Sequence, residues 1–535
     1  MPEVGMKAPA VRPALLRRAL ARPQWLALPL GVLLAQTFGR ADAGGLAVLV
    51  LAAFGALLWH TPLQAPLARA RRGAQLGLLF GLGWFAGGIW WLYISMAVYG
   101  GMPSLLAAGA VLLFSLYLAL YPALACALAS ALAPPAAATP WPLARGLGAA
   151  AALAGAWTVG EVLRGTVFTG FPWLAVGYSQ VGGPLAGVAP LLGGYGVGFV
   201  AVLAAALLAL ATQLGLRDTA VAVLALVALA LGSARVGDLR WTRADGPPLR
   251  VALLQGDVAQ GEKFRPEALA PTLKLYGDWL RSVHADLIVT PETALPTLPA
   301  YLPHGYLDQL RAALRAHGAQ ALVGIPLTRG ADGYTNSVIG LGGNHAYRYD
   351  KAHLVPFGEF IPYGFHWFVR LMHMPLGDFA RGRLDQPSFG VDGRLIAPTI
   401  CYEDLFGEQL AQRFRDPASA PDVIANLTNL AWFGDTVALP QHLQIARMRS
   451  LEFQLPSVRA TNTGITAIID ARGRVTAQLP SFTAGVLLGR VQPMRGVTPY
   501  AWLASRLGYA PVLLLAALAL ALAAVAARAL PTIRD

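Results

Sequence analysis

Eight long apolar stretches limit what this chain of 535 residues can fold into. Crossing the hydrocarbon core of a bilayer takes about 20 predominantly apolar residues in a helix. The stretches are 25–39, 45–59, 73–96, 105–132, 146–162, 197–214, 219–233 and 509–527. The first two and the seventh are short, so one of them could be re-entrant. The sequence therefore predicts a polytopic α-helical membrane domain with about eight spans.

The amino-acid composition is also typical of a membrane protein. Hydrophobic residues make up 56% of the chain and charged residues only 13%, whereas an ordinary globular domain is about 25% charged. The net charge of +13 comes almost wholly from arginine, and no run of basic residues with interleaved aromatic residues is present. We therefore expect no nucleic-acid partner, and we assign the basic excess to insertion polarity and anionic lipid headgroups.

The arginines beside the apolar stretches predict an orientation. Basic residues collect in the loops that stay in the cytoplasm. The arginines concerned are Arg12, Arg17, Arg18, Arg22, Arg69, Arg71, Arg72, Arg145, Arg217, Arg528 and Arg534. They put both termini in the cytoplasm, and seven spans then carry the long polar segment to the extracytoplasmic side.

The chain divides into three parts on this interpretation. Residues 1–240 form the membrane domain, 241–496 the extracytoplasmic domain, and 497–535 a last span with a short cytoplasmic tail. The middle part alternates strand and helix patterns, which favours an α/β sheet covered by helices. The expected strands are 249–255, 286–290, 319–325, 335–341, 395–400, 423–427, 457–461 and 465–470. The expected helices are 266–283, 305–316, 405–414 and 441–453.

Three residues with useful chemistry each follow an apparent strand of this middle part. Glu292 follows 286–291, Lys351 follows 346–350, and Cys401 follows 395–400. The carboxyl ends of strands in open α/β sheets are where sites assemble, so we expect the three to converge. The only other cysteine, Cys126, lies in an apolar stretch, so Cys401 has no disulfide partner within its domain.

The three residues suit nucleophilic catalysis. A thiol with a pKa near 8.5 becomes a good nucleophile when a base takes its proton, and Glu292 is the candidate base. Lys351 would place a positive charge at a developing oxyanion, with the Tyr402 N–H as a second donor. We expect Asp404 to cap a following helix whose dipole favours the thiolate. Each residue also has an ordinary interpretation, as a small buried side chain, a loop carboxylate or a surface charge.

Other catalytic classes lack support. Neither HxxxH nor CxxC occurs, so we expect no metal site and no cofactor. A serine hydrolase elbow, Gly-x-Ser-x-Gly, is absent from the sequence.

At these residues the chain resembles the nitrilase, or carbon–nitrogen hydrolase, superfamily, whose hallmark is a Glu-Lys-Cys triad on an αββα sandwich. More narrowly, it resembles the bacterial apolipoprotein N-acyltransferase family, which places such a domain between N-terminal spans and one C-terminal span. The matching stretches are 251–256 (VALLQG), 290–293 (TPET), 349–362 (YDKAHLVPFGEFIP), 401–404 (CYED), 426–433 (NLTNLAWF), 459–464 (RATNTG), 169–173 (TGFPW) and 177–180 (GYSQ).

The resemblance implies a two-step acyl transfer in the bacterial inner membrane. Cys401 would take an acyl chain from a phospholipid and pass it, as a thioester, to the free amine of a diacylated lipoprotein. Glu292 would be the general base and Lys351 the oxyanion partner. Residues Glu359, Tyr402 and Glu403 would orient the triad or substrate, or be structural. We expect a monomer with its catalytic domain on the periplasmic side.

Two aromatic residues and one segment are candidate lipid contacts. Phe264 stands near the place where the family commonly has tryptophan, so an indole N–H is lost there. Trp173 lies in an outward loop and would rim a lipid portal or serve as an interfacial anchor. The segment 357–375 would be a lid over the thiol or a membrane-docking segment.

Glu161 and Arg164 lie three residues apart near the end of an apolar stretch. They would form a local ion pair or a headgroup site.

Two other functions compete with this one. A membrane-tethered amidase would have the same triad but would need only one span. A transporter with an inert soluble domain predicts polar residues and broken helices within the spans, whereas these stretches are mostly Ala, Leu and Gly.

Overall fold

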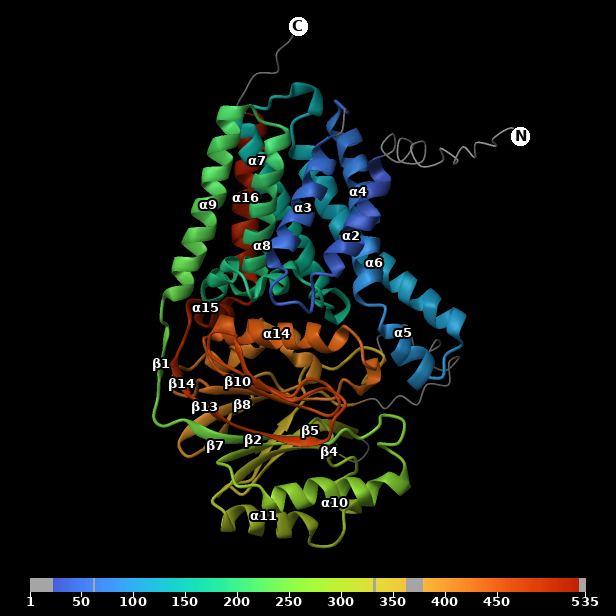
Figure 1. Ribbon diagram of the computed structural model, residues 1–535, viewed down its shortest axis with the longest axis vertical. Helices are drawn as coiled ribbons and strands as arrows, with labels where there is room; N and C mark the ends of the chain where they lie inside the picture. The colour runs from blue at the N-terminus through green and yellow to red at the C-terminus, as the bar shows by residue number, and fades with distance from the viewer. Residues whose placement is uncertain (1–22, 61–62, 331–332, 362–378, 529–535) are drawn as a thin grey trace, which may run out of the picture.

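The computed structural model describes residues 23–60, 63–330, 333–361 and 379–528. A bundle of apolar helices stands on two stacked β-sheets, and two further helices cover the far side of the sheets (Figure 1). Arg12, Arg17, Arg18, Arg22 and Arg534, which contributed to the orientation argument, lie outside the described residues. So does most of the expected lid, 362–375.

A helix lies in each of the eight predicted apolar stretches. The main helices are α2 (Ala27–Ala35), α3 (Gly44–Trp59), α4 (Pro66–Gly88), α6 (Ser104–Leu132), α7 (Leu143–Arg164), α8 (Ala189–Ala209), α9 (Leu216–Asp238) and α16 (Ala510–Arg528). Among the described residues, five helices are long and apolar enough to cross a membrane, or six if one bent pair counts as a single span. The two shorter apolar helices span Gln24–Ala35 and Gly44–Trp59. Several helices are therefore candidate membrane spans by length and composition, and the number eight stays a prediction.

The third stretch, expected as one continuous span over 73–96, is broken. Helix α4 ends at Gly88, and the chain bends by 60° before it continues over Leu92–Tyr99. In a continuing helix the Gly88 carbonyl would accept the N–H four residues on. Here it accepts hydrogen bonds from two side chains instead, the Trp91 indole at 3.0 Å and the Gln441 amide at 3.1 Å. A local indole and one side chain of the sheet domain thus take the place of the next backbone N–H where the helix ends.

Helices α4 and α6 pack with their backbones almost touching. Gly73, Gly77 and Gly81 repeat every fourth residue on α4 and face α6. A Cβ atom at Gly77 would lie 2.5 Å from the Pro122 carbonyl oxygen. Small residues at such an interface let helices approach closely, which is how helices associate where lipid supplies no hydrophobic driving force.

The polar middle of the chain forms two mixed six-stranded sheets. The first has the order β13-β2-β3-β4-β5-β6 and the second β12-β11-β10-β9-β8-β7. The strands of the first are β13 (Gly485–Val491), β2 (Leu249–Gln255), β3 (Leu287–Val289), β4 (Gln320–Arg329), β5 (Gly333–Leu341) and β6 (Tyr347–Asp350). Those of the second are β12 (Val475–Gln478), β11 (Ala467–Ile469), β10 (Ser457–Thr461), β9 (Val423–Thr428), β8 (Arg394–Ile400) and β7 (Phe389–Val391). In each sheet three neighbouring strands are parallel (β2, β3, β4 and β8, β9, β10) and the remaining pairs antiparallel.

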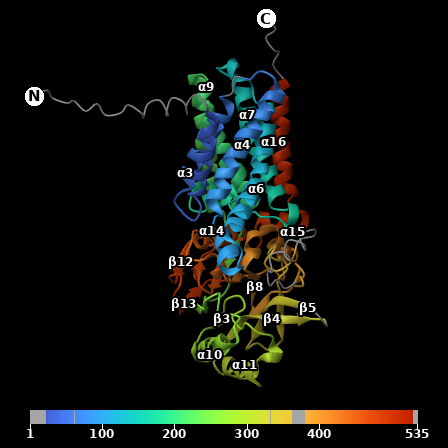
Figure 2. The same ribbon diagram turned by 90° about the vertical axis from the view of Figure 1, so that its right-hand side faces the viewer.

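The two sheets face each other across a buried apolar core that includes Leu253, Val289, Ile400 and Leu427. Helices α10 (Pro266–Ser282) and α11 (Tyr306–Ala316) cover the outer face of the first sheet. Helices α14 (Ala438–Phe453) and α15 (Pro499–Leu507) lie between the second sheet and the bundle, as Figures 1 and 2 both show. The expected αββα arrangement is confirmed.

One expected helix of this domain is wrong. Residues 405–414 do not form a continuous helix: a 3-10 turn over Cys401–Leu405 leads into α13 (Gly407–Leu410) and a second 3-10 turn over Ala411–Phe414. Buried side chains dictate the first turn, because Glu403 accepts the Ile400 N–H at 2.7 Å and Asp404 accepts the Thr399 hydroxyl at 2.9 Å.

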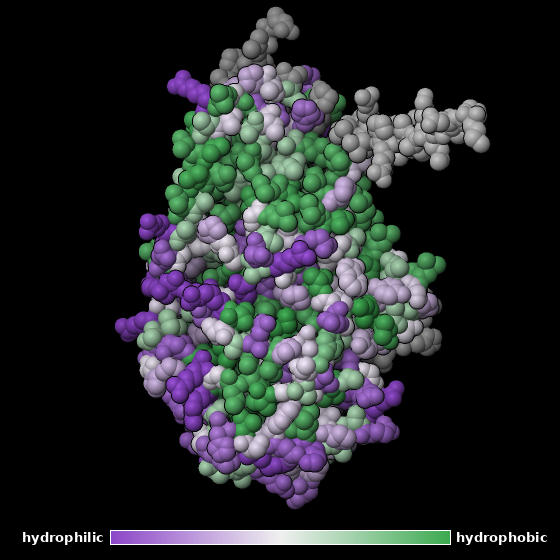
Figure 3. Space-filling model, viewed as in Figure 1, coloured by the Kyte–Doolittle hydropathy of each residue, from purple (hydrophilic) through white to green (hydrophobic). Residues whose placement is uncertain are grey.

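The chain enters and leaves the sheet domain at one place. Strand β1 (Thr242–Ala244), just after α9, pairs antiparallel with β14 (Met494–Gly496), just before α15. Figure 3 shows the change of surface: apolar residues cover the bundle, and hydrophilic residues are concentrated around the sheet domain.

Candidate active site

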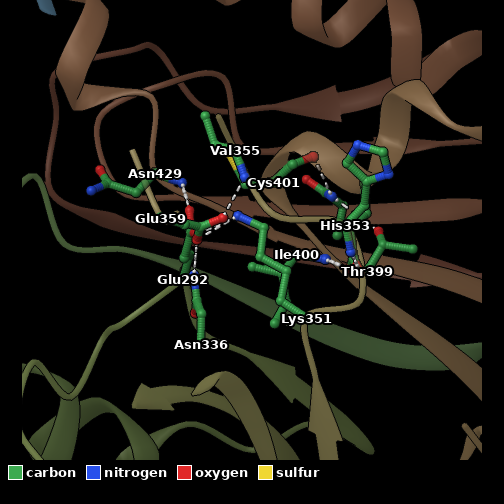
Figure 4. Close-up of polar contacts among 12 residues, drawn as sticks. Glu292, Asn336, Lys351, His353, Val355, Glu359, Thr399, Ile400, Cys401 and Asn429 are labelled. Atoms are coloured by element: carbon green, nitrogen blue, oxygen red, sulfur yellow. Dashed lines mark hydrogen bonds and ion pairs between the residues drawn. The ribbon is translucent and has the colours of Figure 1, made fainter. Parts of the chain in front are cut away.

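The three expected residues come from strand ends of both sheets and meet between them (Figure 4). Glu292 follows β3 and Lys351 follows β6 in the first sheet, and Cys401 follows β8 in the second. Because the sheets pack face to face, the carboxyl ends of these strands open on the same side, and Cys401 lies beside the other two. The structure thus brings Glu292, Lys351 and Cys401 together, as expected from the sequence.

Lys351 lies between two carboxylates. Its Nζ is 2.8 Å from Glu359 Oε1 and 3.3 Å from Glu292 Oε1, and the side chain is only 1% exposed. Burial lowers the pKa of Lys351, but the charges of Glu292 and Glu359 outweigh it and hold the pKa above its ordinary value. Lys351 is therefore a permanent positive charge in the site.

Amide groups fix both carboxylates. The Asn336 side chain donates to Glu292 Oε1 at 2.7 Å and to Glu359 Oε1 at 2.8 Å. The Asn429 N–H donates to Glu292 Oε2 at 2.9 Å, and the Val355 N–H donates to Glu359 Oε2 at 2.8 Å. Glu359 thus lies in direct contact with the lysine and belongs to the same cluster.

Cys401 occupies a strained turn. Its φ is +51°, in the left-handed region that residues other than glycine rarely adopt. Burial and the charge of Glu292 raise the pKa of the thiol to about 12, and Lys351 only partly offsets them. The resting side chain is a thiol, so attack on a carbonyl requires a base.

The expected role of Asp404 is wrong. Instead of capping a long helix, its carboxylate accepts from Thr399 and pairs with Arg459 at 3.7 Å. The turn that follows Cys401 is a 3-10 segment, not a helix with a dipole able to favour the thiolate.

Glu403 connects the backbones beside two of the central residues. Its carboxylate accepts the Ala352 N–H at 2.6 Å and the Ile400 N–H at 2.7 Å, so it joins the residue after Lys351 to the residue before Cys401. The Tyr349 hydroxyl donates to it at 2.8 Å and the His353 N–H at 3.2 Å. The Glu403 carboxylate thus holds the two backbone segments together.

The candidate lipid contacts have different surroundings. Trp173 is 3% exposed and packs against Trp91 with tilted rings whose centroids are 4.9 Å apart. Its indole donates to Gln441 at 2.8 Å, so it is packed inside and not on a rim. Because Gln441 accepts the indole N–H of Trp173, the ring is buried without an unpaired donor. Phe264 is 60% exposed beside the site. Glu161 and Arg164 form the local ion pair at 3.8 Å.

Sequence reasoning missed several members of the cluster. Asn336 lies in a run of buried polar residues, 335–337, inside an otherwise apolar strand, and that run was the available signal. Lys263 donates to the Glu292 carbonyl oxygen at 2.9 Å and is one of only four lysines in a chain that otherwise uses arginine. The Asn429 contact is made by a backbone N–H, for which side-chain identity gives no signal.

Comparison with known proteins identifies the family. The model of the apolipoprotein N-acyltransferase N-terminal domain matches residues 30–207, and that of carbon–nitrogen hydrolase matches 250–500. An apolipoprotein N-acyltransferase of Ralstonia nicotianae is 48% identical over 508 residues, which cover 92% of each chain. This chain belongs to the apolipoprotein N-acyltransferase family. Another apolipoprotein N-acyltransferase, from Verminephrobacter eiseniae, is 49% identical over 485 residues, 86% of this chain and 88% of the relative.

Among solved structures, the C. elegans NitFhit protein matches 48% of this chain and 63% of its own, with 17% identity and a TM-score of 0.37. Membership of the apolipoprotein N-acyltransferase family rests on the family models and the relatives. This membership agrees with the structure, in which several apolar helices are candidate membrane spans and the sheet domain has a nitrilase-like fold.

Proposed function

We propose that the protein moves an acyl chain from a membrane phospholipid, through a thioester on Cys401, to the free N-terminal amine of S-diacylglyceryl-cysteine apolipoproteins. One observation carries the mechanism: Lys351 Nζ lies within 3.3 Å of one carboxylate and 2.8 Å of another, beside a thiol. The family relationship supplies the substrates, because relatives over most of the chain are named apolipoprotein N-acyltransferases.

In the first step the thiol of Cys401 attacks the ester carbonyl of the phospholipid while Glu292 takes its proton. Lys351 balances the negative charge that develops on the carbonyl oxygen. The bond to the glycerol oxygen then breaks, and Glu292 returns the proton to that oxygen. A lysophospholipid leaves, and the acyl chain stays on sulfur.

In the second step the neutral amine of the lipoprotein attacks the thioester carbonyl. Glu292 accepts a proton from the amine, the carbon–sulfur bond breaks, and the proton passes to the Cys401 sulfur. The product is an amide, and the enzyme returns to its starting protonation state. One carboxylate thus serves as base and acid in both halves, as a ping-pong reaction requires.

The proposal includes a membrane topology. Helix α9 runs toward the sheets and α16 away from them, so Arg217 at the start of α9 and Arg528 at the end of α16 lie at the end of the bundle far from the sheets (Figure 1). Basic residues mark the cytoplasmic side. We place eight spans in the bacterial inner membrane, within 1–240 and 497–535, and the domain 241–496 of a monomeric enzyme in the periplasm.

Labelled lipid tests the function directly. Purified protein incubated with phospholipid labelled in one acyl chain acquires label that neutral hydroxylamine releases, and Cys401→Ala acquires none. Adding a diacylated lipopeptide with a free amine discharges the label to an amide. Retention of label by Cys401→Ala refutes the mechanism, and discharge only to water favours the tethered amidase.

A further inference from the structure

A second lysine is buried in the site and has no role in the two steps above. Lys263 is 2% exposed, and its ammonium donates to the Glu292 backbone carbonyl at 2.9 Å. An ammonium has three donor hydrogens, and the described residues supply this single hydrogen-bond acceptor. The ammonium also lies 5.9 Å from the centroid of the Phe264 ring, which offers no hydrogen-bond acceptor lone pair. A buried charge is costly unless partners satisfy it, and two of the donor hydrogens have no acceptor among the described residues.

The side-chain amide of Gln260 also has donor hydrogens without an acceptor among the described residues. Gln260 lies three residues before Lys263 and is 7% exposed. Its oxygen accepts from the Asn429 side chain at 2.7 Å, whereas its Nε2 has no partner among the described residues. Asn429 also donates its backbone N–H to Glu292 Oε2, so Gln260 is connected to Glu292 through Asn429, and Lys263 binds the backbone of the same glutamate.

The two unfilled groups are both donors, and one is a cation, so their complement is an oxyanion. Lys263 is a second cation beside Glu292, in addition to the Lys351 that Glu292 and Glu359 share. Burial lowers the pKa of Lys263 to about 8, while the charges of Glu292 and Cys401 oppose this shift. A bound anion would hold the ammonium in its charged form.

A phospholipid offers such a group close to its reactive ester. Its phosphodiester and its acyl esters are carried on the carbons of one glycerol. When an ester carbonyl lies at Cys401, the phosphate is therefore confined to the neighbourhood of the site. The diacylated lipoprotein amine carries no phosphate, which assigns the subsite to the donor half of the reaction.

We propose that Lys263 and Gln260 bind the phosphodiester of the acyl donor while the thioester forms. This inference rests on the proposed function and adds to it the chemical group by which the donor is recognised. Lys263 would then be a substrate-binding residue that selects phospholipids over neutral glycerides.

Two donors with the same labelled acyl chains test the proposal, phosphatidylglycerol and the neutral diacylglycerol, each in detergent micelles. The readout is the rate at which Cys401 acquires hydroxylamine-labile label. Losing a hydrogen bond to a charged group costs roughly 10- to 100-fold, so Lys263→Met slows labelling from phosphatidylglycerol by about that factor. Labelling from diacylglycerol stays within about threefold, and Gln260→Leu shows the same selectivity with a smaller loss.

Lys274→Met is the matched control, because Lys274 pairs with Asp278 on the exposed face of α10 and leaves both rates unchanged. Millimolar inorganic phosphate leaves labelling from phosphatidylglycerol unchanged if the subsite is built for lipid. Inhibition by phosphate that Lys263→Met abolishes would instead show a site for free anions.

The other outcomes are also decisive. Equal slowing with both donors makes Lys263 a positioning residue for Glu292, and no slowing with either removes it from the reaction; each overturns the proposal. If Lys263→Met does not fold, as thermal unfolding in detergent shows, Gln260→Leu decides by the same ratio. Wild-type protein that labels from neither donor refutes the proposed function itself.

Discussion

The phenolic hydroxyl of Tyr402 donates a hydrogen bond to the carbonyl oxygen of Gly170 at 2.9 Å. Tyr402 directly follows the nucleophile, and Gly170 lies in the loop after α7 of the bundle. Arg164 holds the same loop through the Trp173 carbonyl at 2.7 Å. The membrane domain therefore shapes the turn that carries Cys401 in addition to anchoring the enzyme.

Tyr402→Phe tests this connection. The substitution keeps the ring but leaves the buried Gly170 carbonyl without its donor, which costs about 1–3 kcal/mol. We expect a lower unfolding temperature and roughly tenfold slower thioester formation, measured by thermal unfolding in detergent and by lipid labelling. Tyr301→Phe, at a residue that is 72% exposed, is the control. Unchanged stability and rate in Tyr402→Phe would show that the contact is dispensable.

The two carboxylates beside Lys351 should differ in importance. Glu292→Gln removes the general base and slows single-turnover labelling by about 10²- to 10⁴-fold. Glu359→Gln retains an oxygen that can accept from Lys351 and leaves the base in place, so we expect a loss of roughly 10- to 100-fold. Equal losses would mean that both carboxylates move protons, or that neither does.

The reactivity of Cys401 should depend on pH in an unusual way. Because the pKa of the thiol is raised to about 12, its alkylation by iodoacetamide rises about tenfold per pH unit from about pH 6 to 9. The measurement uses a Cys126→Ala background, which leaves one thiol. Glu292→Gln removes a charge that raises this pKa, so alkylation becomes faster although acyl transfer becomes slower. A rate that levels off near pH 7 would contradict the raised pKa.

A buried carboxylate at the junction of the two parts predicts a pH-dependent stability. Glu452 of α14 accepts the Gly194 N–H at 2.6 Å and pairs with Arg449 at 3.0 Å. Burial raises the pKa of Glu452 to about 8, against the opposing charge of Arg449, while the nearby Glu408 raises it further.

The folded-state pKa lies above the unfolded value of about 4.3, so the stabilisation is complete below that value and disappears as the pH rises through about 8. We expect the unfolding temperature to fall between about pH 4 and 8 and to level off above that range, and to fall less in Glu452→Gln. Parallel curves for wild type and Glu452→Gln would assign the pH dependence to other groups.

The glycines of α4 predict a steric effect. A methyl group at Gly77 would lie 2.5 Å from a backbone oxygen of α6, so Gly77→Ala forces the two helices apart. We expect a loss of roughly 1–3 kcal/mol, seen as a lower unfolding temperature in detergent. Gly109→Ala is the matched control, because a Cβ there meets nothing within 4 Å. Equal effects would show that α4 and α6 do not pack this closely.

The local pattern of apolar and polar residues was enough to predict strands that are buried along their whole length. The predicted strand 457–461 coincides with β10, which is buried along its whole length. The short antiparallel strand β12, in which half-buried and exposed residues alternate, was not among the predicted strands. The break in α4 could not be foreseen, because the Gln441 side chain that binds Gly88 comes from a residue 353 positions away.

The central residues of the site were predictable because strand ends converge, and because glutamate, lysine and cysteine have distinctive chemistry. The contacts of the supporting residues were not predictable. Glu403 was expected only from the family resemblance, and its bonds to backbone N–H groups on two segments had no local signal. The burial of Trp173 depends on helix α14. Such contacts exist only after the sheets and the bundle have packed together.

The pairing of β1 with β14 has a consequence for how such an enzyme arises and can be engineered. The first and last residues of the sandwich lie side by side, since Thr242 is the register partner of Gly496. A domain with adjacent ends can be inserted between two helices without moving either of them. Replacing it with another sandwich of the same fold should therefore require no new linker.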